Sequence, residues 1–532
     1  MSALPSGATA QAVARGEPFA APPPHELERR VTGSSAFVRR IRVEGARSLP
    51  PAAVADAVRP YENRVLGMAE IRELQQRLTR LYLERGFASS GVLVPDTALR
   101  GDELTFQAVE GTVTQVRFLH APRRSRASYL TRLLVPDDSE PLNVGLLQER
   151  LAWLRDSGIV DRINAEVVPL PRLGESELLV HVEEPRPWSV RLDYDNHHSP
   201  TIGARRATLR LAHRNVTGWG DSFESRYGDT EGLNDVSAAY SLPLPATPLR
   251  LNVRWERSDS LAISPTAFRA LDIRALSTSS AAELSYAFLT RASQELSVFA
   301  TRARRRSDTT LLGMPFSFVP GIEDGASRVD VNRAGVNFSA RQRESVLFAR
   351  VQASVGRANV AGDTSVDALP ARRFRSLFLQ SQYARRLPWW QAQAVARVEA
   401  QHTPDILLPL ERYSLGGAAT VRGYRENLTL RDRALLASGE LQVPVTRADS
   451  GWSVAIAAFY DYGWSRNTLD RDDGLPRRLA AAGLGLIANG PAGLAARLYV
   501  ARPSRRGLTP RDDIQDRGVH FMVSWEPTRL LP

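Results

Sequence analysis

The chain has 532 residues, more than one ordinary hydrophobic core accommodates, so two or more domains are expected. Cysteine is absent, which excludes disulfides, thiolate nucleophiles and cysteine metal sites. The formal net charge is +11 and all 69 basic residues are arginine. Because these arginines are spread along the chain without an aromatic-interleaved patch, the composition does not indicate nucleic-acid binding.

The hydropathy of the chain argues against membrane helices. Hydrophobic residues make up 43% of the sequence and the mean hydropathy is −0.26. No apolar run reaches the roughly 18 residues that a membrane helix needs. A membrane β-barrel stays compatible with these values, because its strands alternate lipid-facing and lumen-facing residues and keep the average hydropathy low.

The first part of the chain predicts a leader and a small α+β domain. Residues 1–35 are rich in Ala, Pro, Gly and Ser, and three consecutive prolines at 22–24 would break a long helix, so a flexible leader is expected. Over 36–111 the period at which apolar residues recur changes from 2 residues to 3.6 residues and back to 2, which predicts the order β-α-α-β-β. The predicted strands cover 37–45, 89–96 and 102–111, and the predicted helices lie within 50–61 and 67–87.

The same order of elements then repeats over 112–184. Strands are predicted at 113–121, 163–171 and 176–184, and helices at 126–134 and 143–158. A repeated supersecondary unit indicates a modular array.

From 185 to 532 the sequence predicts strands only. In the first of them Trp188, Val190, Leu192 and Tyr194 alternate with polar residues, two of them aspartates. Charges at every second position cannot all lie in a dry core, so one apolar and one wet face are expected. About sixteen such segments fit between 187 and 526, each long enough for the roughly 9–11 residues of a transmembrane strand.

The connections between these segments alternate in length. Short ones such as "VTGWGD", "PATP", "RQRES" and "NGPAG" alternate with long ones, which we place at 257–277, 303–328, 356–372, 412–433 and 464–477. This alternation is typical of an outer-membrane barrel of about sixteen antiparallel strands. A soluble β-sandwich is the alternative, but it explains neither the loop lengths nor the charged inner faces.

Two β-α-α-β-β units before such a barrel resemble the two-partner secretion transporters, the TpsB family of ShlB/FhaC/HecB-like haemolysin secretion/activation proteins. Members carry two POTRA domains and a sixteen-stranded barrel, and the resemblance covers about 37–532. The family motif V-R-G-[YF] matches Val421, Arg422, Gly423 and Tyr424 in 412–433, which joins segments eleven and twelve and is by strand count the sixth long loop. Its second motif, F-x-D on the thirteenth strand, matches Phe459 and Asp461.

The resemblance implies that the connection 412–433 folds back into the barrel lumen and that Arg422 pairs with Asp461. An arginine–carboxylate pair is directional and strong where water is partly excluded. Gly423 would allow a tight turn or a close approach to the wall. Tyr424 would pack its ring while its hydroxyl stays hydrogen-bonded.

The resemblance also implies a function, which is export of one large β-helical partner protein, an adhesin or haemolysin type of TpsA-like exoprotein, across the bacterial outer membrane without ATP. The periplasmic POTRA domains would capture the partner's N-terminal secretion domain by extending a sheet edge and using an apolar groove. Leu78, Tyr82, Val92 and Val94 are the candidate substrate-binding residues, with ordinary domain packing as the alternative for each.

Three other functions stay open on the sequence. An outer-membrane protein insertase of the same superfamily usually carries more POTRA domains, and a passive porin lacks them. A barrel enzyme would need a catalytic motif, but there is no G-x-S-x-G, H-E-x-x-H or nucleotide-binding G-x-x-x-x-G-K-[ST]. The eight histidines show no ligand spacing, so neither a metal, a cofactor nor enzymatic activity is expected.

Two further partners are expected from the barrel itself. The run Arg302, Arg304, Arg305 and Arg306 is predicted where the seventh strand enters a long outer loop, where it would meet anionic lipid or lipopolysaccharide, or simply solvent. The last segment, 518–527, ends near an aromatic residue, which suits recognition by the barrel-assembly machinery but also a membrane-interface belt.

Overall fold

The computed structural model describes residues 35–244, 247–265, 267–291, 293–361, 369–446, 451–469, 473–509 and 512–530. The chain divides into two compact units, Met1–Pro185 and Arg186–Pro532. The predicted leader lies outside the described residues except for Ser35. None of the helices in these ranges is long and apolar enough to cross a membrane.

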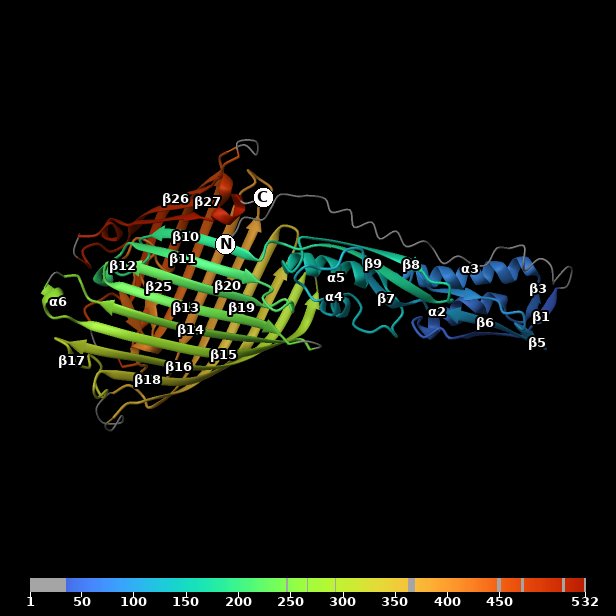
Figure 1. The fold of residues 1–532 in the computed structure, drawn as a ribbon, viewed down its shortest axis with the longest axis horizontal. Coiled ribbons are helices and arrows are strands. Elements are labelled where there is room, and N and C mark those ends of the chain that lie inside the picture. Colours follow the sequence, from blue (N-terminus) through green and yellow to red (C-terminus); the bar gives the residue numbers. More distant parts are fainter. Residues whose placement is uncertain are drawn as a thin grey trace. The chain divides into compact units, whose positions relative to one another are not determined.

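The first unit begins with one α+β module (Figure 1). Its sheet has the order β2-β6-β4, with β6 parallel to β2 and antiparallel to β4. The predicted strand 37–45 is divided into β1 and β2, and the sequence did not indicate the short β3, which pairs with β1, or β5, which pairs with β6. The elements are β1 (Ala36–Val38), β2 (Arg40–Glu44), α2 (Pro51–Val58), β3 (Arg64–Leu66), α3 (Met68–Glu84), β4 (Gly91–Leu93), β5 (Leu99–Arg100) and β6 (Glu103–Val109).

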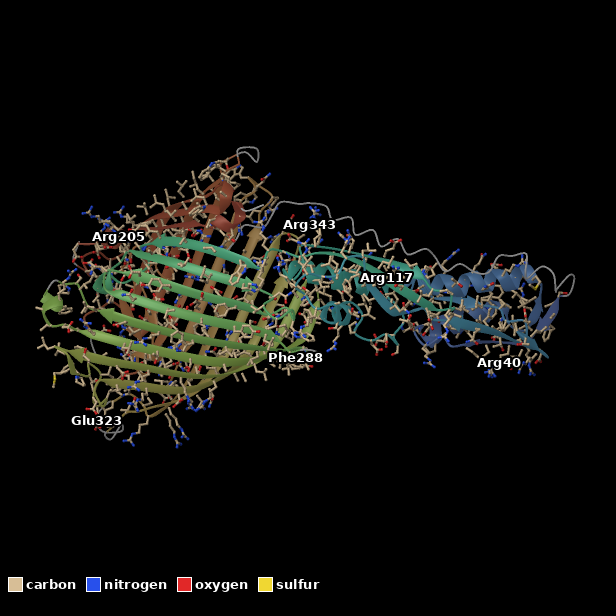
Figure 2. The ribbon with its side chains drawn as sticks, in the orientation of Figure 1. Arg40, Arg117, Arg205, Phe288, Glu323 and Arg343 are labelled. Carbon is tan, nitrogen blue, oxygen red and sulfur yellow. The ribbon has the colours of Figure 1, made fainter. Side chains whose placement is uncertain are left out.

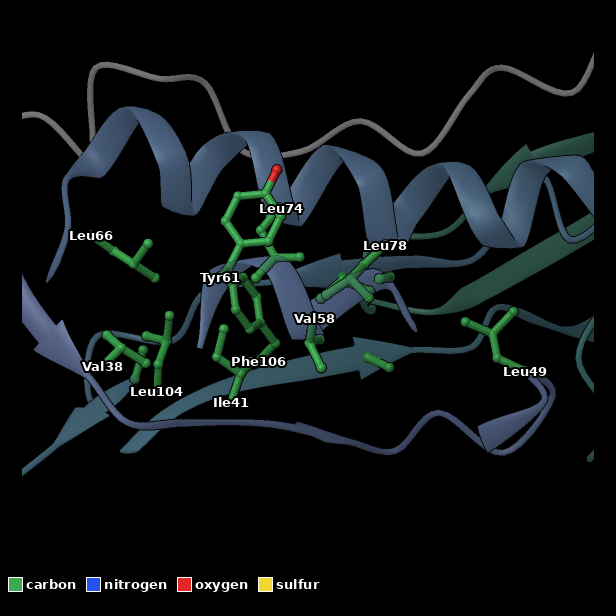
Figure 3. Packing of buried hydrophobic residues seen from close by; sticks show 14 of the residues in the cluster. Val38, Ile41, Leu49, Val58, Tyr61, Leu66, Leu74, Leu78, Leu104 and Phe106 are labelled. Atoms are coloured by element: carbon green, nitrogen blue, oxygen red, sulfur yellow. The ribbon is translucent and has the colours of Figure 1, made fainter. Parts of the chain in front are cut away.

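Helix α3 supplies much of the core of this module. Leu74, Leu78 and Tyr82 recur every four residues, so one face of the helix is apolar, and all three are fully buried. Figure 3 shows Leu74 and Leu78 facing the sheet residue Phe106, which is also fully buried. Packing of this face against the sheet therefore holds α3 in place.

The same burial corrects the substrate-binding residues expected from sequence. Leu78 and Tyr82 are 0% exposed and Val92 is 1% exposed, while Val94 packs against the same core. Their side chains fill the interior of the module, so they do not present an apolar groove to a partner. Helical periodicity marks an apolar face but does not distinguish a core face from a binding face.

The second module repeats the architecture with sheet order β7-β9-β8. Asn143 begins its longer helix by accepting a hydrogen bond from the Leu146 N–H, and its side-chain amide donates to the Arg85 carbonyl at 2.9 Å. That bond joins the two modules, because Arg85 ends α3 of the first. The elements are β7 (Thr112–Phe118), α4 (Ala127–Leu134), α5 (Val144–Asp156), β8 (Arg162–Pro169) and β9 (Glu175–Glu183).

The second unit is a closed antiparallel barrel of sixteen long strands, to which the two-residue β17 (Met314–Pro315) adds only a pairing with β16. The long strands are β10 (Trp188–Asp195), β11 (Arg206–Arg214), β12 (Ser222–Thr230), β13 (Leu233–Pro243), β14 (Leu249–Leu261), β15 (Arg274–Arg291), β16 (Gln294–Leu311), β18 (Ala326–Arg341), β19 (Ser345–Ala358), β20 (Arg373–Arg386), β21 (Gln393–His402), β24 (Arg433–Pro444), β25 (Ser453–Arg466), β26 (Arg478–Asn489), β27 (Leu494–Pro503) and β28 (Val519–Trp525). The predicted fold class, two α+β POTRA-type modules before a sixteen-stranded barrel, is confirmed.

The short turns and the long loops gather at opposite ends of the barrel. Figure 2 labels Phe288 and Arg343, beside short turns, at one end, and Arg205 and Glu323, in long connections, at the other. The predicted alternation of connection lengths is therefore present except at 231–232, where a two-residue turn joins β12 to β13 at the end with the long loops, which is called the outer end below.

Several strands run further toward the outer end than the sequence indicated. Strand β16 continues to Leu311 and β18 begins at Ala326, so much of the predicted loop 303–328 is strand. The arginines at 302 and 304–306 accordingly lie inside β16 and not where it enters a loop. Backbone pairing with β15 and β18 continues past the apolar part of the strand, which the side-chain pattern alone does not reveal.

Candidate functional site: a loop held inside the barrel

The sixth connection at the outer end, between β21 and β24, folds into the barrel lumen. Its base is the short ladder of β22 (Tyr413–Leu415) with β23 (Thr429–Arg431). Of its tip residues, Val421 is 0%, Arg422 7% and Tyr424 5% exposed. Their partners are inward-facing side chains of the barrel wall, described below, so this segment, 416–428, is referred to as the lumen loop.

Arg422 meets Asp461 of β25, the thirteenth long strand. Its Nε and Nη2 donate to the two carboxylate oxygens at 2.8 and 2.9 Å, and its backbone N–H donates to one of them at 3.0 Å. Asp461 is fully buried. The structure thus brings together the two residues that the family resemblance paired, in the bidentate geometry that is strongest for a guanidinium and a carboxylate.

Further wall residues complete the arginine pocket, and the sequence did not indicate them. The Arg422 guanidinium also donates to Glu440 of β24, and Ser438 donates to Asp461 at 2.7 Å. Tyr499 of β27 donates to Glu440 at 3.2 Å. One arginine therefore faces two carboxylates, so its removal would leave the buried Asp461 and the partly buried Glu440 without their counter-ion.

Phe459 of the F-x-D motif packs under the same guanidinium. The Arg422 Cζ lies 3.5 Å from the centroid of the Phe459 ring and 4.8 Å from that of Tyr499. A guanidinium over an aromatic face gains a cation–π contribution while its edge stays free for hydrogen bonds. The motif therefore supplies both the aromatic floor and the carboxylate of one arginine site.

Gly423 allows the lumen loop to touch the barrel wall. Its φ is +93°, which L side chains rarely adopt, and a Cβ at this position would lie 2.9 Å from the Ala501 Cβ. Its N–H donates to Nε2 of His520, a fully buried residue of β28, at 3.1 Å. Close approach and positive φ both require glycine here.

The residues after Gly423 attach the lumen loop to the last outer connection, 504–518. The Tyr424 hydroxyl contacts the Ala480 carbonyl and the Ser504 hydroxyl, each at 3.3 Å. Arg425 donates to both carboxylate oxygens of Asp516, at 2.5 and 2.7 Å. A second bidentate arginine pair thus follows the first by three residues, and nothing in the local sequence indicated it.

Gln515 connects the lumen loop to the seam where the barrel closes. The seam between β10 and β28 pairs only four residues on each strand, Leu192–Asp195 with Met522–Trp525, whereas β10 pairs eight with β11. Gln515 is fully buried, accepts from the Glu426 N–H at 2.9 Å, and donates to the carbonyls of Asn196 and His198 at 2.6 Å each. The loop and the shortest pairing between long strands of the barrel therefore share one side chain.

The comparisons with known proteins agree with this architecture. The family model for haemolysin secretion/activation proteins, ShlB/FhaC/HecB, matches residues 174–488, and the model for the ShlB-type POTRA domain matches 36–111. The outer membrane transporter CdiB of Escherichia coli O6:K15:H31 (strain 536 / UPEC) is 22% identical over 483 residues, which are 87% of this chain and 78% of that protein.

Solved structures share the fold. CdiB from Escherichia coli superposes with a TM-score of 0.71 at 19% identity, covering 97% of this chain and 94% of the other. CdiB from Acinetobacter baumannii gives a TM-score of 0.66 at 15% identity, covering 93% and 91%.

Proposed function

The chain belongs to the ShlB/FhaC/HecB family of haemolysin secretion/activation proteins, outer-membrane transporters of two-partner secretion with periplasmic POTRA domains, and on this premise we propose that it exports one large β-helical exoprotein without ATP. The observation that carries the proposal is the lumen loop: it lies across the inside of a closed barrel, held by Arg422 on Asp461 and Glu440. A polypeptide passing through the lumen would have to displace it. The loop therefore acts as the element that moves during export.

The lumen wall suits a moving chain. Its inward-facing side chains are Arg, Glu, Gln and Ser, for example Arg350, Gln352 and Ser354 of β19, which form a chain of hydrogen bonds with Glu283 of β15. Such polar groups offer many weak contacts that exchange readily with a passing backbone. Folding of the partner outside the cell would drive export in one direction. Nucleotide hydrolysis is not invoked, because the sequence has no nucleotide-binding loop.

The first POTRA module would capture the partner at the edge of β4. The Val92 backbone there does not face β6 but bonds to α3, with the Thr79 hydroxyl accepting from its N–H at 3.1 Å and the Gln75 amide donating to its carbonyl at 2.9 Å. An incoming strand of the secretion domain would replace these two side chains by main-chain hydrogen bonds. The side chains also protect the edge from unwanted pairing while no partner is bound.

Export of one dedicated large exoprotein can be tested by deleting the gene. In the source bacterium, the gene is deleted and the extracellular, surface and outer-membrane protein complements are compared. Loss of one large exoprotein, restored by the full chain but not by a chain lacking 36–184, supports dedicated export. An unchanged exoprotein complement would refute it, and restoration by the truncated chain would support a passive channel.

Insertion of other outer-membrane proteins is the second candidate, because the four-residue seam between β10 and β28 is a natural opening in the barrel wall. The matches to the family model for haemolysin secretion/activation proteins and to the ShlB-type POTRA model favour export. In the same experiment, an insertase would reduce many barrel proteins together and leave no single exoprotein missing. Insertion of the chain itself would depend on the barrel-assembly machinery, and its outer face would contact membrane lipid, including lipopolysaccharide.

A further inference from the structure

The arginine run of β16 is divided between the two faces of the barrel wall. Arg305 points into the lumen, where its Nη1 donates to the Leu410 carbonyl and lies 3.4 Å from Glu411. Arg302, Arg304 and Arg306 lie on the opposite face, where their side chains are 55%, 74% and 50% exposed. In a barrel that spans the outer membrane, this opposite face meets lipid.

Neighbouring strands add arginines to the same face. Arg306 lies directly opposite Arg328 of β18, and Arg357 of β19 lies directly opposite Arg373 of β20. Like charges in directly opposed positions destabilise a sheet unless an anion neutralises them. Together these seven exposed residues form the outer arginine patch: Arg302, Arg304, Arg306, Arg328, Arg357, Arg373 and Arg375.

Few carboxylates offset this charge. All of β16, β18, β19 and β20 lies within the described residues, and on their outer face only Asp308 and Asp330 are acidic. Asp330 is shared by Arg302 at 3.7 Å and Arg304 at 3.2 Å, and Asp308 pairs with Arg306 at 2.7 Å. Seven arginines against two aspartates leave an excess of five positive charges on one surface.

Two adjoining hollows lie along this surface. The first, of about 420 Å³, is lined in part by three arginines of the patch, Arg304, Arg306 and Arg328, with Trp255 at its side. The second, of about 540 Å³, is mainly apolar and begins at Arg302. Its floor consists of small residues, Ala282, Ala300, Ala334 and Ala353, between the larger Leu251, Leu284 and Val355.

The order of residues along each strand fixes how the two hollows relate to the membrane. Going from the outer end of β16 toward its short turn, Arg302 is followed on the same face by Ala300, Val298 and Leu296. In β20, Arg375 is followed by Leu377 and Leu379. The cationic hollow thus lies on the outer side of the apolar one, at the depth where headgroups of the outer leaflet meet their acyl chains.

We propose that this face binds a phosphorylated glycolipid of the outer leaflet, of the bisphosphorylated, multiply acylated lipid A class. Guanidinium groups bind phosphate oxygens in bidentate fashion, and several arginines on one surface match a headgroup that carries two phosphates. The hollow with the alanine floor receives an acyl chain of the lipid. A soluble phosphate has no acyl chain and would leave this hollow empty. Trp255 lies beside the headgroup, the position that aromatic residues favour at a membrane interface. The proposal rests on the outer-membrane location and not on which protein is exported.

Lipid binding is measured on the full chain in neutral detergent, titrated with hexa-acylated bisphosphoryl lipid A and followed by native mass spectrometry. The test variant is Arg302→Gln with Arg304→Gln, and the matched control is Arg478→Gln with Arg502→Gln, two exposed arginines at the outer ends of β26 and β27. We expect binding to weaken about tenfold or more in the test variant only. Equal binding by the test variant and the native chain, or equal weakening in the control, would overturn the site.

A second variant separates a lipid from a soluble phosphate. Ala334→Phe fills the apolar hollow and leaves every arginine in place, and its lipid-facing position spares the barrel interior. Lipid A binding should weaken, whereas binding of the glucosamine disaccharide 1,4′-bisphosphate, which lacks acyl chains, should stay unchanged. If Ala334→Phe binds lipid A as tightly as the native chain does, no acyl chain occupies the hollow and the lipid assignment fails. Heat-modifiable migration on electrophoresis establishes that each variant has folded, and export of the partner is not part of the readout.

Discussion

Arg422 and Asp461 are 39 residues apart in sequence and share three hydrogen bonds, two from the guanidinium and one from the Arg422 backbone N–H. The backbone bond matters as much as the ion pair, because it fixes the main chain of the lumen loop and not only one long side chain. The carboxylate thus holds the loop against β25. An element that must move during export is therefore held by a few strong, separable contacts.

The first prediction concerns this pair. Arg422→Ala leaves the buried Asp461 and the partly buried Glu440 without their counter-ion, and removing one partner of a buried pair costs about 3–5 kcal/mol. We expect export of the partner to fall about tenfold or more. In a double-mutant cycle with Asp461→Ala, the double variant should lose less stability than the two single variants lose together, by about 0.5–3 kcal/mol. Export is quantified in culture supernatants and stability by the temperature at which heat-modifiable migration is lost.

Arg350→Ala is the control for this cycle. Arg350 also lies over a phenylalanine, 3.8 Å from the Phe299 centroid, and pairs with Glu283 at 3.2 Å, and both of these partners are wall residues outside the lumen loop. The Arg350→Ala substitution removes a similar arginine from the lumen without releasing the lumen loop, so export of the partner should change little. A loss of export as large as that of Arg422→Ala would mean that lumen charge, and not loop attachment, is what counts.

A second prediction tests the close contact at Gly423. In Gly423→Ala the new Cβ would lie 2.9 Å from the Ala501 Cβ at a φ of +93°, and such backbone strain costs about 1–3 kcal/mol. The variant should lose hydrogen-exchange protection in the lumen loop. Ala501→Gly in the same chain removes the contact but not the φ strain, so it should restore part of the protection.

Gly439→Ala controls for the substitution itself, since a Cβ at Gly439 of β24 would meet nothing within 4 Å. Protection of the lumen loop should be unchanged in this control. If Gly423→Ala also leaves the loop fully protected, the loop does not depend on close approach to β27.

The third prediction concerns the connection between the lumen loop and the barrel seam. Gln515→Leu removes one hydrogen bond to the loop and two to the strand end at Asn196 and His198, each worth about 0.5–1.5 kcal/mol. Because β10 and β28 pair over only four residues, we expect faster amide exchange in both strands as well as in the loop. Gln352→Leu, in the wall of β19, is the control. Faster exchange in the loop alone would show that the seam is independent of it.

The sequence predicted most of the fold because barrel strands and POTRA helices have strong periodicities. It failed at strand ends. On the outer face of β15 and β16, Thr278, Ser280 and Arg304 replace apolar residues, so an alternating pattern ceases while backbone pairing continues. Side-chain polarity reports where the membrane ends, and the strand ends several residues later.

The candidate site was only partly predictable, for a related reason. Arg422, Phe459 and Asp461 were found through motifs and strand count. Glu440 and Gln515 were not, because barrel closure brings them to the lumen loop and no local pattern marks a partner tens of residues away. The buried face of α3 shows the opposite error, in which a strong local pattern was assigned to partner binding although it builds a core.

The last prediction is a pH dependence in the second POTRA module. The Glu184 carboxylate accepts hydrogen bonds from the backbone N–H groups of Arg123, Arg124 and Ser125 at 2.8, 2.9 and 2.6 Å. Burial alone would raise the pKa of Glu184, but these hydrogen bonds outweigh it and hold the pKa below its ordinary value. A lowered folded-state pKa means that the stabilisation is complete above the unfolded value of about 4.3 and is lost as pH falls through the folded value.

Amide exchange in residues 119–126 of the full chain should therefore accelerate between about pH 5 and pH 3, after correction for intrinsic rates. Glu184→Gln should bring the accelerated exchange to pH 7, with a loss of about 1–3 kcal/mol that partial exposure of the carboxylate reduces. Glu166→Gln, on β8 of the same module, controls for the loss of one charge. If exchange in 119–126 has the same pH profile in Glu184→Gln and in the native chain, the carboxylate does not organise this segment, and its low pKa has no structural consequence.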